Sequence, residues 1–111
     1  VVRPGGRVGL LVFLATVPEL DNPPEGNHFP SPDGLDALLG EAGLTVLNRA
    51  AESGLPSPPP SWQEHIDAVE AELDRRYRSD PAWRTAQDQH HRISHLLEKG
   101  EVEAQVILLA V

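Results

Sequence analysis

The side chains best suited to chemistry gather in one irregular segment, from Thr16 to Phe29. His28 stands near its end, and a histidine can take a proton from a reacting group that lies within hydrogen-bonding distance. Thr16, Asn27 and Phe29 share the segment and could contact a substrate. A loop histidine is more often an ordinary surface residue, so both interpretations of His28 stay open. We take His28 as the candidate catalytic residue and all four as candidate substrate-binding residues.

Aromatic and histidine side chains further along the chain offer two more possibilities. Trp62 could cover an apolar ligand, although packing in a core explains such a residue more simply, and we include it among the substrate-binding candidates. His91 and His95 stand four residues apart, a spacing that can chelate a metal on one helix face. No third ligand is close to them in the sequence, so we predict no metal site.

Composition and charge exclude several classes of partner. The chain has 111 residues, 17 acidic against 9 basic side chains, a net charge of −8, and neither cysteine nor methionine. An acidic chain without a basic cluster repels a phosphate backbone, so we expect no nucleic acid and no anionic membrane partner. No apolar run reaches the roughly 20 residues of a membrane span. The lack of cysteine fits a cytoplasmic protein, and the lack of methionine predicts a processed product or a segment of a longer chain.

The first half of the sequence predicts a strand, a long loop, a helix and a second strand. Pro4-Gly5 suits the centre of a type II turn, and Val8–Ala15 is apolar throughout, as in a strand buried on both faces. Ser31 can cap a helix that ends at Gly43. A short strand, Leu44–Leu47, follows. Because the irregular segment leaves the carboxyl end of the first strand, it stands where open α/β sheets bind ligands.

The second half predicts a helical insertion and a last strand. Residues 53–60 form a proline-rich connector, and residues 61–100 form a helical hairpin in which Ser61 caps the first helix and the segment Ser79-Asp80-Pro81 caps the second. Each helix has an apolar stripe with helical spacing, and we expect the two stripes to bury one another. The strand Val102–Val111 completes what we treat as a single domain, 1–111. The stripe of the first helix comprises Trp62, Ile66, Val69, Leu73 and Tyr77.

Three stretches together resemble the C-terminal half of the class I S-adenosylmethionine-dependent methyltransferases, especially those that act on small molecules. The turn Val2–Arg7 with its apolar strand is similar to the entry into that family's fifth strand. Asn27–Pro32 and the helix after it are similar to the next helix, and Leu44–Leu47 and Gln105–Val111 are similar to the sixth and seventh strands. The resemblance implies an α/β fold: a partial Rossmann-like sheet of three strands, with the last strand antiparallel and central.

The resemblance also implies what this chain lacks. The family holds its cofactor with a glycine-rich loop after a first strand and an acidic residue after a second, and neither is present here. Gly5-Gly6 precedes its strand and is a turn rather than a cofactor cradle. We therefore expect S-adenosylmethionine to be the cofactor of the parent protein, with no cofactor-binding residue in this chain, and we expect the chain to be inactive alone.

In that topology the strand Val8–Ala15 would expose the edge that normally pairs with a fourth strand. A long apolar edge is a template for pairing with another chain. We expect a homodimer, or the missing N-terminal half, to pair at Val8–Ala15. An alternative to the enzyme interpretation is therefore a non-enzymatic binding or assembly module that pairs through this edge.

Overall fold

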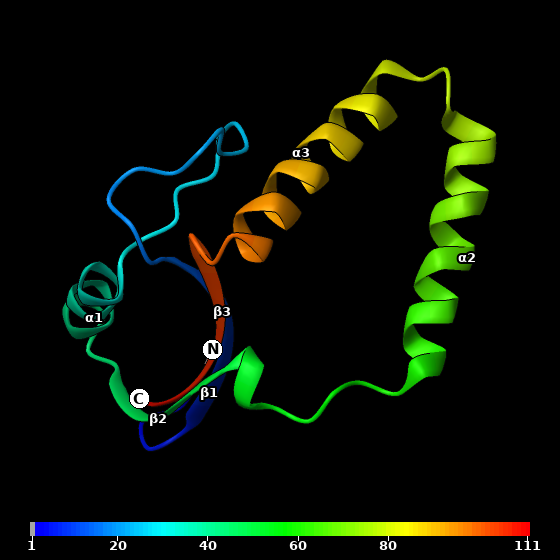
Figure 1. The fold of residues 1–111 in the computed structure, drawn as a ribbon. Helices are drawn as coiled ribbons and strands as arrows, with labels where there is room; N and C mark the ends of the chain where they lie inside the picture. The colour runs from blue at the N-terminus through cyan, green and yellow to red at the C-terminus, as the bar shows by residue number, and fades with distance from the viewer. Residues whose placement is uncertain (1) are drawn as a thin grey trace.

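The computed structural model describes residues 2–111 and contains three helices, a three-stranded sheet and one short 3-10 helix (Figure 1). In chain order the elements are β1 (Arg7–Ala15), α1 (Pro32–Glu41), β2 (Thr45–Ala51), η1 (Glu52–Gly54), α2 (Pro60–Tyr77), α3 (Pro81–Glu98) and β3 (Val102–Ala110).

The sheet has the strand order β1-β3-β2, with β3 antiparallel to both neighbours. β1 and β2 are consequently parallel to each other, and their carboxyl ends lie at the same edge of the sheet. Ala15 of β1 stands opposite Val102, and Ala51 of β2 opposite Gln105. The predicted α/β class and the central, antiparallel position of the last strand are confirmed.

The hydrophobic core lies between one face of the sheet and α1. Leu35 and Leu39 of α1 pack against Leu14, Ile107 and Leu109. The amphipathic spacing of α1 places its two buried leucines on one side. Ser31 caps α1 as predicted, with its Oγ accepting from the Gly34 amide at 3.1 Å, and Gly43 follows the helix with a φ of 71°.

The other face of the sheet is only partly covered. The C-terminal end of α3 covers the end of this face at which β3 begins, where Leu96, Val102 and Ala104 are buried. Leu11 is 64% exposed, Phe13 38% and Val106 38%, and we call these three residues the open face. The prediction that Val8–Ala15 is buried on both faces is therefore wrong, because no helix within residues 2–111 packs over the middle of this side.

The outer edge of β1 is open over most of its length. Thr16 N donates to Glu101 O, and Val111 N to Gly6 O, so even-numbered residues of β1 hydrogen-bond to β3. In an antiparallel pair the odd-numbered residues then point their N–H and C=O groups outward. The outward N–H of Ala15 donates to Pro30 O at 2.9 Å. The remaining outward groups, which we call the open edge, belong to Arg7, Gly9, Leu11 and Phe13.

The helical insertion differs from the predicted hairpin. α2 begins at Pro60 with Pro59 as its N-cap, whereas Ser61 lies inside the helix; a proline fits the first turn because its missing N–H would have no helical partner. Asp80 does cap α3, accepting from the Ala82 amide at 2.8 Å. α2 has no buried residue, and it stands apart from the sheet and from most of α3 (Figure 1).

The two apolar stripes consequently do not bury each other. In the stripe of α2, Trp62 is 61% exposed, Ile66 50% and Val69 58%. The side of α2 that faces α3 instead bears polar residues such as Asp67 and Asp74.

Within residues 2–111 every helix is too short or too polar to cross a bilayer.

Candidate functional site

The carboxyl ends of β1 and β2 form the edge at which an α/β sheet presents ligand-binding groups. We call it the carboxyl edge. Thr16 follows β1 directly, and Glu52 and Ser53 follow β2. These residues line a cavity of about 340 Å³ with the start of β3 and the last turn of α3. Its lining residues are Thr16, Glu52, Ser53, Leu97, Gly100, Val102, Glu103 and Ala104.

A second cavity opens at the same edge, between β1 and the start of α1. It has a volume of about 460 Å³ and is lined by Ala15, Thr16, Val17, Pro18, Ser31 and Pro32. Thr16 lines both cavities, so it is the predicted site residue that lies most centrally at the carboxyl edge.

Thr16 has a structural task there. Its Oγ1 donates to Gly100 O at 2.5 Å, and its backbone N donates to Glu101 O at 2.9 Å. These bonds join the end of β1 to the turn before β3. Because the hydroxyl proton is already donated, the Thr16 oxygen can act toward a ligand only as an acceptor.

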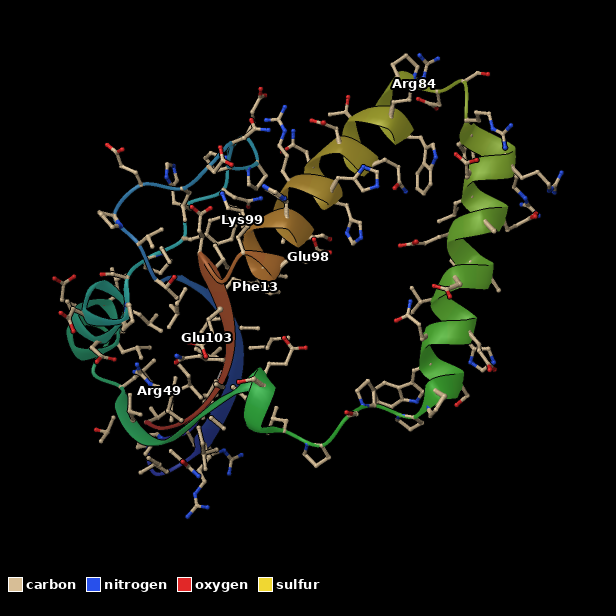
Figure 2. The ribbon with its side chains drawn as sticks, viewed as in Figure 1. Phe13, Arg49, Arg84, Glu98, Lys99 and Glu103 are labelled. Carbon is tan, nitrogen blue, oxygen red and sulfur yellow. The ribbon has the colours of Figure 1, made fainter. Side chains whose placement is uncertain are left out.

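The segment after Thr16 is held against the middle and the C-terminal end of α3. The backbone N of Glu25 donates to Gln89 Oε1 at 2.8 Å, and Lys99 Nζ lies 3.1 Å from Asp21 Oδ2. Lys99 lies at the base of α3, where the loop passes (Figure 2). The hydrogen bond from Lys99, reinforced by its charge, lowers the pKa of the Asp21 carboxyl, and the same hydrogen bond raises the pKa of Lys99.

Asn27 and His28 lie in the part of the loop that returns toward α1. Both are exposed, and Phe29 is half-buried. Neither Asn27 nor His28 forms a side-chain hydrogen bond to another residue within 2–111, and neither lines the two cavities of the carboxyl edge. The structure therefore places them in the same loop as Thr16 but outside its cavities, with His28 free to meet a molecule from solvent.

Trp62 is not brought to this loop. It lies in the first turn of α2, beyond the connector, and is exposed. Sequence reasoning missed Glu52, Ser53 and Glu103, because it ended the second strand at Leu47. β2 in fact continues to Ala51, so its carboxyl end comes four residues later. The apolar Ala50-Ala51 pair after Arg49 is the signal that could have extended it.

A third cavity lies between α2 and α3 and has a volume of about 730 Å³. Trp83 Nε1 donates to Asp74 Oδ1 across it at 3.3 Å. Three further acidic side chains line it, Asp67, Glu70 and Asp88, with two arginines, Arg78 and Arg84, near the turn between the helices. No group of three or more metal-ligating side chains is assembled within residues 2–111.

Comparison with known proteins adds no relative to this picture. No family model, no curated protein and no solved structure matches the chain.

Proposed function

We propose that this chain is the C-terminal part of a class I S-adenosylmethionine-dependent methyltransferase that acts on a small molecule, and that it is inactive alone. The observation that supports the proposal is the strand order β1-β3-β2 with β3 antiparallel and central. That order is the one implied by the resemblance for the fifth, seventh and sixth strands. The sheet is then the C-terminal part of a larger Rossmann-like sheet.

The two edges of the sheet support the same proposal. β2 has a bulge between Val46 and Asn48, and Arg49 forms an ion pair with Asp36 of α1. Bulges and charges are devices that protect a terminal strand from further pairing. β1 pairs with β3 in an uninterrupted register along its length, and from Val8 to Ala15 it has no charged side chain. The edge at β2 is thus protected from pairing with a further strand, whereas the edge at β1 is able to pair with one.

The residues of this chain do not fit the cofactor. The Gly5-Gly6 turn lies at the amino end of β1, opposite the carboxyl edge, and the Gly6 amide is already donated to Arg3 O. We therefore derive no methyl-transfer step from this chain. Its contribution is to shape the acceptor side of the site, with Thr16 accepting a hydrogen bond and His28 available to take a proton from the acceptor.

Calorimetry with S-adenosylmethionine tests the proposal. The chain is measured alone and joined to the segment encoded immediately upstream of it. We expect heat of binding only for the joined protein, because the glycine-rich loop would come from the upstream segment. An upstream segment without a glycine-rich strand–loop–helix, or a joined protein that does not bind, would contradict the proposal.

A second candidate function is a non-enzymatic assembly module, and the open edge favours it. Four residues of β1 present unpaired N–H and C=O groups in the described part of the chain. Two copies could pair there in antiparallel fashion about a two-fold axis. In this case the chain alone would be the functional unit and would need no cofactor.

A further inference from the structure

We propose that α2 is a dimerisation helix: its apolar stripe packs against the same stripe of a second copy of this chain, with the two helices antiparallel. This inference is independent of the methyltransferase proposal. It starts from the apolar stripe of α2, of which four residues are exposed and Leu73 is half-buried: Trp62, Ile66, Val69, Leu73 and Tyr77.

The stripe is turned away from α3, the helix next to it. The α2 residues that line the cavity toward α3 are Asp67, Glu70, Ala71, Asp74 and Arg78. At about 100° per residue, the centre of that set lies about 115° around the helix from the centre of the stripe. A small movement that closed α2 onto α3 would bury carboxylates and leave the stripe in solvent. The chain's own hairpin therefore offers the stripe no apolar partner.

The exposure is large for such side chains. Trp62, Ile66 and Val69 are each at least half exposed, and Tyr77 is 47% exposed. Single exposed apolar residues are ordinary, but a continuous row on one helix face marks an interaction surface. The radius of gyration, 16.9 Å, exceeds the roughly 13 Å of a compact domain of this length. The projecting helix thus remains accessible to another molecule.

The stripe is complementary to itself when the second helix runs in the opposite direction. The stripe is centred on Val69. Trp62 lies at its N-terminal end and Tyr77 at its C-terminal end, about four helical turns away. An antiparallel copy places Trp62 against the partner stripe's Tyr77 position and Ile66 against its Leu73 position, while Val69 lies at the two-fold axis. Such a pairing matches a large ring with a large ring at each end and aliphatic residues in the middle.

Charge favours the antiparallel over the parallel arrangement. The part of α2 from Pro60 to Glu70 has three acidic residues, Glu64, Asp67 and Glu70, and neither lysine nor arginine. The C-terminal end has three arginines, Arg75, Arg76 and Arg78, which outnumber the two carboxylates they pair with. Antiparallel pairing sets this acidic part of one helix beside the basic end of the other, and it also opposes the two helix dipoles. Parallel pairing would set the two acidic parts side by side.

Distance measurement between spin labels tests this directly, because the chain has no cysteine and one introduced cysteine gives one label per copy. Along the length of α2, Ala71→Cys is nearly level with the two-fold axis at Val69, whereas Ser61→Cys lies near the N-terminal end of the helix. At 1.5 Å per residue, two copies of residue 71 are offset by about 5 Å along the helix axis and two copies of residue 61 by about 25 Å. We expect a clearly longer distance for label 61 than for label 71.

A pair of matched variants identifies the surface. Val69→Glu puts a charge at the centre of the stripe and should weaken association by at least about tenfold. Ala71→Glu adds the same charge on the opposite side of α2 and should leave the label-61 distance unchanged. Because both positions are exposed, circular dichroism should show unchanged helix content for both. Leu11→Pro, at the open edge of β1, should also leave the distance unchanged.

Three outcomes would overturn the proposal. Equal distances for the two labels would mean a parallel pair. No dipolar coupling at about 100 μM would mean that α2 is not a dimer interface at ordinary working concentrations. Equal loss of coupling in Val69→Glu and Ala71→Glu would mean that charge rather than the stripe governs association. Each result leaves the calorimetric test of the methyltransferase proposal unaffected.

Discussion

Among the candidate site residues, Thr16 and His28 show what a sequence can and cannot locate. Thr16 directly follows an apolar strand, so its place at the carboxyl edge follows from the strand itself. The position of His28 depends on the path of the loop, which is set by contacts with residues more than 60 positions away, at Gln89 and Lys99. Hydrogen bonds of that kind have no local sequence signal. They place His28 outside the cavities that Thr16 lines.

The Asp21–Lys99 contact makes the attachment of this loop sensitive to pH. The folded pKa of Asp21 is lowered, so its contribution is present above the unfolded value of about 3.9 and is lost as the pH falls through the folded pKa. The folded pKa of Lys99 is raised, so its contribution is present below about 10.4 and is lost as the pH rises through the folded pKa. The loop is therefore held most firmly between those limits.

Asp21→Asn should loosen the loop at neutral pH because it removes the charge that Lys99 meets. We expect the protection factor of the Glu25 amide, which donates to Gln89, to fall by about two- to fivefold. Hydrogen exchange followed by NMR measures it. Asp33→Asn, a carboxylate outside this contact, is the control. Equal protection in the wild-type chain and in Asp21→Asn would show that the ion pair does not hold the loop.

At the level of elements, local sequence signals predicted where helices and turns begin more accurately than they predicted which side chains are buried. Three local predictions are confirmed: the Ser31 cap, a cap within Ser79-Asp80-Pro81, where Asp80 accepts the bond, and the turn at Pro4-Gly5, where Gly5 has a φ of 79°. Burial was predicted less well. The apolar run of β1 was expected to be covered on both faces, and the stripe of α2 was expected to face α3. Both expectations assumed that apolar residues find their partners within this chain, whereas Leu11 and Val69 remain exposed in it.

The open edge of β1 predicts a specific effect of proline. Leu11 points its N–H outward, so Leu11→Pro removes a donor from the edge while the bonds from β1 to β3 remain. If two chains pair through β1, sedimentation at micromolar concentration should show a shift toward a smaller assembly in Leu11→Pro. Leu11→Ala keeps the N–H and controls for the lost side chain. An unchanged sedimentation profile in Leu11→Pro would contradict pairing at this edge.

At the level of the whole molecule, the chain is a half-covered sheet with a projecting pair of helices. α1 encloses one face of the sheet, while the open face spans β1 and β3 and the open edge lies on β1. The principal extents, 47 × 33 × 28 Å, reflect the helices that extend away from the sheet. The sequence could predict the order of the strands through the resemblance. It could not reveal the splayed helices, because helical spacing predicts that a stripe is buried without telling what buries it.

The central claim is that the sheet continues beyond β1 in the parent protein, and amide hydrogen exchange along β1 tests it most directly. The chain is measured alone, at a concentration where it sediments as a monomer, and joined to its upstream segment. We predict that the outward amides of Gly9, Leu11 and Phe13 exchange rapidly in the isolated chain and become protected in the joined protein, while those of Leu10 and Val12 are protected in both. Outward amides that exchange equally fast with and without the upstream segment would contradict the account.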